Sequence, residues 1–158
     1  MTAHGSDTSP VEVWRAHRRL SAWLGAAWAR ELGAATGLSE ADAEVLCFLA
    51  SSGKKTVRAL EVRCGLEWEK SRLSHQLRRM DQRGLLTREE WPHDSRGSAV
   101  AITEKGRLLA EQAESAQQRF ARRVFGDILT SAQRSQVVSL ADAIILDTPD
   151  ELPPSGHP

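Results

Sequence analysis

Residues 11–35 carry the first extended helical pattern of the chain. Apolar residues recur there at intervals of three and four, the spacing of one face of an α-helix. The stripe contains Val13, Leu20, Leu24, Ala27, Trp28 and Leu32, and Trp14 and Trp23 widen it. A helix that is apolar over such a broad arc is usually buried by more than one neighbour. We therefore expect this helix to pack against more than a small local core, and Gly37 to terminate it.

Two shorter helices are predicted next. Ser39 is a suitable N-cap for the first, with Asp42 at the third helical position in a capping-box arrangement. Its apolar stripe consists of Ala41, Val45, Phe48 and Leu49. The second short helix begins near Thr56 and stops at Gly65. Its buried side is either Val57, Leu60 and Cys64 or Ala59 and Val62, and the pattern does not decide between the two sets.

A fourth helix is predicted over residues 69–83, and its two faces differ in character. Leu73, Leu77 and Met80 form one apolar face. The opposite face holds Ser71, Ser74, His75 and Arg78, and it is flanked by Lys70, Arg72, Gln76 and Arg79. Gly84 ends the helix. The segment from Gly65 to the helix start contains Trp68, which is predicted to pack at the helix N-terminus as a hydrophobic staple.

The helical period then gives way to two short strands, Leu86–Trp91 and Ala99–Thr103. The residues between them, 92–98, have the composition of a turn. A β-hairpin with a polar, partly basic tip is therefore expected.

The remainder of the chain is predicted to form two more helices. Thr103 caps a long helix that runs to about Phe125, and Thr130 with Gln133 forms a capping box for the last helix. That last helix is expected to bury Val137, Leu140, Ala141, Ile144 and Ile145. Residues 1–10 and 148–158 are expected to be disordered tails, the second because it is rich in proline.

The charge is unevenly distributed, although the formal net charge is zero. Between Lys54 and Arg88 there are ten basic and four acidic residues, whereas Glu104 to Pro158 holds six basic and eight acidic residues. A basic middle region suits contact with phosphates. The sequence has no apolar run long enough to cross a membrane and no apolar stretch of a signal peptide near its start, so a cytoplasmic location is expected.

The order of these elements, with a hairpin directly after the fourth helix, favours a winged helix-turn-helix. The major groove of DNA admits one α-helix, which needs an apolar face to anchor it and an outer face of hydrogen-bond donors. Residues 69–83 meet both needs. We expect Ser71, Ser74, His75 and Arg78 to face bases, and Lys70, Arg72, Gln76 and Arg79 to reach phosphates or groove edges. Arg96 at the hairpin tip could enter the minor groove, with Asp94 as its support.

These segments together resemble the MarR family of bacterial transcription regulators, over about residues 11–147. The resemblance is carried by Leu38-Ser39, Thr56-Val57, Arg83-Gly84-Leu85-Leu86, Asp94-x-Arg96 and Ile102-Thr103-Glu104-Lys105-Gly106. It implies a mainly α fold with a β-hairpin wing, in which residues 38–103 bind DNA. It also implies that residues 11–37 and 104–147 form the dimer. The implied function is that of a homodimeric regulator, most often a repressor, on a palindromic operator, and a small aromatic ligand releases DNA in many members of the family.

Other functions find less support in the sequence. Trp14, His17, Arg18 and Trp28 could hold an aromatic anion, although packing of a dimer core explains them as well. The five histidines are scattered, so no metal site or other cofactor is expected, and no motif of a known catalytic site is present. Cys47 is expected in the core. Cys64 is expected to be a partly buried thiol at a helix end, with a redox sensor as the alternative. A winged helix that binds protein instead of DNA is the second function class.

Overall fold

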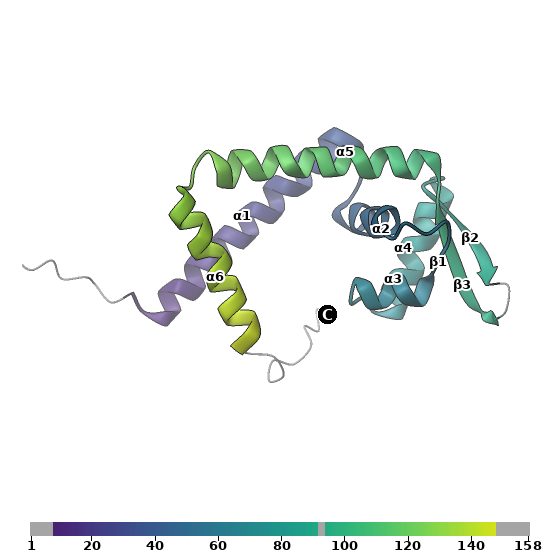
Figure 1. Cartoon of the computed structure of the whole chain (residues 1–158), viewed down its shortest axis with the longest axis horizontal. Helices are drawn as coiled ribbons and strands as arrows, with labels where there is room; N and C mark the ends of the chain where they lie inside the picture. The colour runs from purple at the N-terminus through teal and green to yellow at the C-terminus, as the bar shows by residue number, and fades with distance from the viewer. Residues whose placement is uncertain (1–7, 92–93, 148–158) are drawn as a thin grey trace, which may run out of the picture. The chain divides into compact units, whose positions relative to one another are not determined.

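The computed structural model describes residues 8–91 and 94–147, and the side chains of residues 8–89 and 98–146. It is mainly helical with a small sheet, as predicted (Figure 1). The elements in chain order are α1 (Pro10–Thr36), α2 (Glu40–Ser51), β1 (Val57–Arg58), α3 (Ala59–Gly65), α4 (Lys70–Gln82), β2 (Leu86–Trp91), β3 (Asp94–Ile102), α5 (Glu104–Ala121), the π-helix η1 (Arg122–Gly126) and α6 (Ser131–Asp147). The chain divides into two compact units, residues 1–117 and 118–158.

Two capping boxes fix the starts of α1 and α2. At Ser39, the hydroxyl accepts a hydrogen bond from the Asp42 N–H at 3.2 Å, and Asp42 Oδ2 accepts one from the Ser39 N–H at 2.9 Å. This confirms the predicted cap. The corresponding pair at α1 is Ser9 and Glu12. The expected tail over residues 1–10 is therefore wrong at its end, because Ser9 caps a helix that begins at Pro10, where proline suits the first helical position. Residues 1–7 and 148–158 lie outside the described residues.

The sheet within the described residues has the order β1-β3-β2, and both pairings are antiparallel. Strand β1 was not predicted, since Val57 and Arg58 were assigned to a helix that starts near Thr56. Two residues are too few to show an alternating pattern, and it is the pairing of Val57 with Val100 that makes them a strand. Strand β3 starts at Asp94 rather than Ala99, so Asp94–Ser98 belong to a strand and not to a turn.

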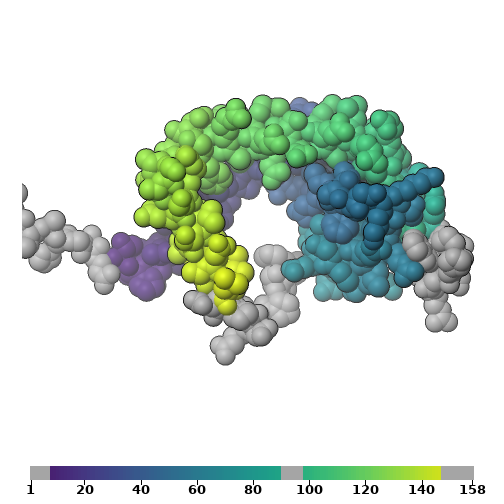
Figure 2. Space-filling model, viewed as in Figure 1, coloured from purple at the N-terminus to yellow at the C-terminus, as the bar shows by residue number. Residues whose placement is uncertain are grey.

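The core of residues 1–117 is formed by α2, α3, α4 and the sheet, and it includes Leu32 from α1 and two alanines of α5. Figure 2 shows the surface atoms of one face of the molecule, with α2, α3 and α4 in blue to teal. The members of the core are Leu32, Leu38, Ala43, Val45, Leu46, Leu49, Val57, Val62, Trp68, Leu73, Leu77, Met80, Leu85, Leu86, Val100, Ala110 and Ala113. The predicted apolar face of α4, Leu73, Leu77 and Met80, is confirmed.

Helix α3 buries the second of its two candidate sets. Val62 is fully buried and Ala59 is half-buried, whereas Leu60 is 57% exposed and Cys64 is exposed. Val57, from the first set, is also buried, but it belongs to β1 and not to α3. Gly65, at the end of α3, lies so close to α2 that a Cβ atom there would come within 2.2 Å of the Phe48 ring. The two helices approach closely because this position has no side chain.

The joint between α3 and α4 is closed by backbone hydrogen bonds. The Trp68 N–H donates to the Arg63 carbonyl at 3.0 Å, and the Glu67 N–H donates to the Cys64 carbonyl at 3.3 Å. Glu67 has a φ of 54°, in the left-handed region. This is the Schellman motif that commonly ends helices, with glutamate where glycine is usual. The same pattern with Gly84 ends α4, where the Leu85 N–H donates to the Met80 carbonyl.

Residues 118–158 form the smaller unit. Thr130 caps α6 together with Gln133, as predicted: the Thr130 N–H donates to Gln133 Oε1 at 2.9 Å, and the Gln133 N–H donates to the Thr130 hydroxyl at 3.3 Å. The expected burial of the α6 apolar residues is not found within one chain. Val137, Leu140, Ile144 and Ile145 are each 49–69% exposed, and Ala141 is exposed as well.

Helix α1 also leaves apolar side chains exposed along its first half. They are Val11, Val13, Trp14, Leu20 and Trp23. Among the described residues, none of the helices is long and apolar enough to span a membrane.

Candidate nucleic-acid interface

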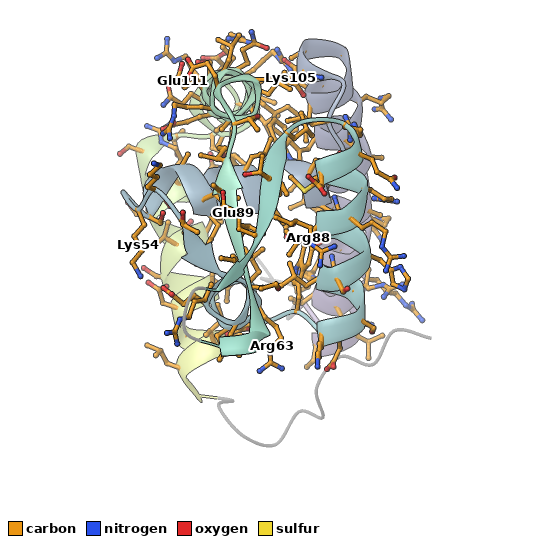
Figure 3. All side chains as sticks on the ribbon, turned by 90° about the vertical axis from the view of Figure 1, so that its right-hand side faces the viewer. Lys54, Arg63, Arg88, Glu89, Lys105 and Glu111 are labelled. Carbon is orange, nitrogen blue, oxygen red and sulfur yellow. The ribbon has the colours of Figure 1, made fainter. Side chains whose placement is uncertain are left out.

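Helix α4 presents an exposed polar face on the side opposite its buried leucines. Ser71, His75 and Arg78 are exposed and Ser74 is half-buried, and Lys70, Arg72 and Arg79 beside them are exposed. In Figure 3 nitrogen-tipped side chains project outward from α4, away from the hairpin. Four cations on one helix, with no acidic residue in its first turn, make this face strongly basic. Eight of the ten residues predicted to bind nucleic acid or support the wing lie on α4, and seven of these eight are exposed or half-buried.

Gln76 is the exception, and its predicted place on the flank of this face is wrong. It is only 5% exposed, because its side chain turns inward to Asp42 on α2. Its Nε2 donates a hydrogen bond to Asp42 Oδ1 at 2.7 Å, and its Oε1 accepts one from Arg79 Nη2 at 2.6 Å. The sequence alone does not show whether a polar residue beside an apolar face points to solvent or to the core. Here the side chain of Gln76 points inward because it hydrogen-bonds to the buried Asp42 on α2.

Asp42 is the centre of a hydrogen-bond network that links α2 to α4. The carboxylate, 2% exposed, also accepts from the Ser39 N–H, the Ser39 hydroxyl and Arg83 Nη1, the last at 2.6 Å. Burial raises the pKa of Asp42, but the hydrogen bonds from Ser39 and Arg83 outweigh it, so the pKa lies below its usual value. Arg83 in turn donates to the Gly37 carbonyl at 3.2 Å, at the end of α1. The sequence pattern around Asp42 indicates only a helix cap.

Trp68 orders the other flank of α4. Its ring is 7% exposed, and the Arg72 guanidinium lies over it, 4.0 Å from the ring centroid. Trp68 directly precedes the N-cap Glu69, and it belongs to the same buried cluster as Leu73, as the predicted staple requires. The stacking places Arg72 at the edge of the exposed face and restricts its motion.

The wing residues are placed only by their backbone. Asp94 and Arg96 both lie on β3, and their side chains are outside the described residues. Their predicted roles therefore stay predictions. Figure 3 labels two neighbours on β2, Arg88 and Glu89, both with exposed side chains.

The four residues considered for an aromatic ligand do not form one group. The rings of Trp14 and His17 stack with their centroids 6.0 Å apart, and Arg18 lies 5.8 Å from the Trp14 ring centroid. Trp28 is fourteen residues further along α1, which corresponds to about 21 Å of helix, and it packs against the core instead. A site that combines all four side chains on one chain is ruled out by this spacing.

The cysteines and histidines give no further site in the part of the chain that the structure describes. Cys47 is half-buried rather than fully buried, and burial together with Glu114 raises the pKa of its thiol. Cys64 is exposed at the end of α3, not partly buried as expected. Residues 8–91 and 94–147 contain no cluster of side chains that could hold a metal ion.

Comparison with known proteins agrees with this arrangement. Residues 36–97 match the model of the MarR family. The crystal structure of AbsC, a MarR family transcriptional regulator from Streptomyces coelicolor, superposes with a TM-score of 0.77 at 27% identity, over 88% of this chain and 95% of AbsC. This chain is therefore similar to MarR family regulators, over residues 36–97 in the family model and over most of its length in fold.

Two further proteins extend the comparison. Sco3205, a MarR family transcriptional regulator from Streptomyces coelicolor, also gives a TM-score of 0.77, at 24% identity over 88% of this chain and 87% of that one, and its structure is a complex with DNA. The HTH-type transcriptional regulator YdgJ of Bacillus subtilis is 22% identical over 108 residues, which are 68% of this chain. The match spans only 65% of the length of YdgJ. The likeness to Sco3205 shows that this chain shares its fold.

Proposed function

We propose that this chain is a transcription regulator of the MarR type that binds double-stranded DNA through α4, with the outer face of that helix in the major groove. The carrying observation is the exposed row of cations on α4 opposite the buried Leu73, Leu77 and Met80. Sco3205, which has the same fold, was crystallised with DNA. In this arrangement Ser71, Ser74, His75 and Arg78 face base edges, and Lys70, Arg72 and Arg79 face phosphates.

We further propose that the binding unit is a homodimer on an inverted repeat. The apolar side chains that α1 and α6 leave exposed would be buried by a second copy. A twofold dimer reads two half-sites about one helical turn apart. A dimer that covers such an operator within a promoter acts as a repressor. Release of DNA by a small aromatic ligand stays a prediction, with Trp14, His17 and Arg18 as the group that would receive the ligand.

The first test is the selection of bound sequences from random DNA by the purified protein, followed by mobility shifts of the selected duplex over a range of salt concentrations. The expected result is a palindromic consensus, with affinity that falls steeply as salt rises. A protein with no affinity for duplex DNA at low salt would contradict the proposal and favour the alternative, a winged-helix module that binds protein.

Two arginine variants test the placement. Arg78→Ala should weaken binding and relax base preference at one position of each half-site, at about 1–3 kcal/mol per contact. Arg96→Ala should weaken binding to all sequences. Arg107→Ala on α5 removes an equal charge outside the α4 face and is the matched control. Unchanged affinity and salt dependence in both of the first two variants would contradict the proposed docking.

A further inference from the structure

Gln76 lies between a group that only accepts hydrogen bonds and a group that only donates them. Its Nε2 is 2.7 Å from Asp42 Oδ1, and its Oε1 is 2.6 Å from Arg79 Nη2. An ionised carboxylate has no proton to donate, and a guanidinium has no lone pair to accept one. The amide of Gln76 therefore has a single orientation in which both contacts are favourable.

The Asp42 carboxylate, which accepts the hydrogen bond from Gln76, is itself held in one orientation. Asp42 Oδ2 accepts hydrogen bonds from Ser39 and Arg83, so Oδ1 is the oxygen that remains for Gln76. Arg83 is held in addition by the Gly37 carbonyl. Because the carboxylate is buried and held from several sides, it cannot turn to release the amide.

We propose that Gln76 is a positioning residue that orients the Arg79 guanidinium for contact with a DNA phosphate, and that Asp42 sets the direction of the Gln76 amide. This inference rests on the proposed function. Gln76 touches no DNA in this arrangement, since its side chain is buried. It acts by ordering Arg79 before binding, so that less side-chain freedom is lost in the complex. Ordering one side chain in advance is worth about two- to tenfold in affinity.

Arg78 provides a comparison on the same helix. It is exposed like Arg79, but no hydrogen bond or ion pair joins it to a residue whose side chain the structure describes. The two neighbouring arginines should thus differ in mobility in the free protein. Their Nε–Hε signals in NMR spectra of the full-length protein, with the heteronuclear relaxation of each, measure this difference directly.

Two variants should release Arg79 without removing it. Gln76→Met keeps a long side chain in the core and removes the amide. In Asp42→Asn the side chain keeps one carbonyl oxygen, and the donors of Ser39 and Arg83 require that oxygen at the position of Oδ2. The new NH2 group therefore takes the position of Oδ1 and faces Gln76. The amide of Gln76 must then turn its oxygen inward and its NH2 group toward Arg79, which can no longer bind to it. In both variants the relaxation of the Arg79 signal should become like that of Arg78.

DNA binding supplies the second readout, with the duplex selected by the wild-type protein and an unselected mixed-sequence duplex as probes. Gln76→Met should weaken binding about two- to tenfold while the dependence on salt stays unchanged, because the charge of Arg79 is retained. Arg79→Gln should lower the salt slope by about one. In an Arg79→Gln background, Gln76→Met should have no further effect, whereas a general loss of structure would weaken binding in both backgrounds.

The outcomes separate this inference from the proposed function. Wild-type protein that binds neither duplex contradicts the proposed function itself. If wild-type protein binds DNA, the role of Gln76 is overturned by an Arg79 as mobile as Arg78 in the free protein. It is equally overturned by equal losses from Gln76→Met in the two backgrounds. The mobility comparison uses wild-type protein, so it holds even if a variant fails to fold.

Discussion

The helix-turn-helix region and helix α6 use apolar residues in opposite ways. In the former, Leu77 and Met80 are almost completely buried by neighbouring elements of the same chain. In α6, Leu140, Ile144 and Ile145 are more than half exposed. A contiguous apolar surface of this kind on a single chain is typical of an interface. The core of the first region is thus completed by its own chain, whereas α6 is left for a partner, which we propose to be a second copy.

The largest expected effect concerns α6. The double variant Leu140→Ser and Ile144→Ser should weaken dimer formation by at least about 1,000-fold, since burial of each such side chain is worth roughly 1.5–3 kcal/mol and a dimer contains two copies. Sedimentation velocity over a range of protein concentrations measures this. Gln136→Ser, a polar change on the same helix, is the control. Unchanged self-association in the double variant would contradict a role of α6 in the proposed dimer.

The next largest effect concerns the stability of the helix-turn-helix region, whose core is formed within one chain. A Cβ atom at Gly106 would lie 2.0 Å from the Leu85 carbonyl oxygen. Backbone cannot move aside as a side chain can, so Gly106→Ala should lower the free energy of unfolding by about 3 kcal/mol. Urea unfolding followed by circular dichroism gives this value. At Gly33 no atom lies within 4 Å of the added Cβ, and Gly33→Ala should be neutral or slightly stabilising. A neutral Gly106→Ala would contradict the close packing.

A smaller effect depends on pH. The lowered pKa of Asp42 means that its ionised form is bound more favourably in the folded state. This stabilisation is present above the pKa of the unfolded chain, about 4, and it is lost as pH falls through the folded value. Stability should therefore decrease in acid, and less steeply in Asp42→Asn. Urea unfolding between neutral and acid pH checks this, with Asp81→Asn, an exposed carboxyl on α4, as the control. Parallel pH profiles for wild type and Asp42→Asn would be the contrary result.

The smallest effect is expected at the surface. Lys54 and Glu61 form an exposed ion pair, and the hydrogen bond from Lys54 lowers the pKa of Glu61. Exposed pairs contribute little because water and salt screen them. Glu61→Gln should leave the melting temperature unchanged within error. A clear drop would mean that this pair supports the packing of α3.

Much of the fold could be predicted from periodicity and caps. Ser39 with Asp42 and Thr130 with Gln133 marked helix starts correctly, because a capping box is a local signal. Strand β1 was not predicted, since a strand of two residues depends on its partner and not on its own pattern. Strand β3 was predicted too short, because its first residues have the composition of a turn.

The candidate site was predictable only on its outer face. Arg78 and His75 follow from their spacing relative to Leu77. The inward turn of Gln76 depends on Asp42, which is 34 residues away in sequence, and no local pattern contains that information. The same reason explains why Trp14 and Trp28 were grouped together: they share a stripe, but only Trp28 meets the core.

The hydrogen-bonded joint at Glu67 has a consequence for how this regulator could respond to a signal. The carbonyls of Arg63 and Cys64 are occupied by the N–H groups of Trp68 and Glu67, and the Trp68 ring is packed into the core. A hinge needs backbone whose dihedral angles can change freely. At this joint the hydrogen bonds and the buried Trp68 ring restrict those angles. Helices α3 and α4 should therefore move together as one rigid body. In the proposed dimer, a signal would then control DNA access by changing the distance between the DNA-binding regions of the two subunits.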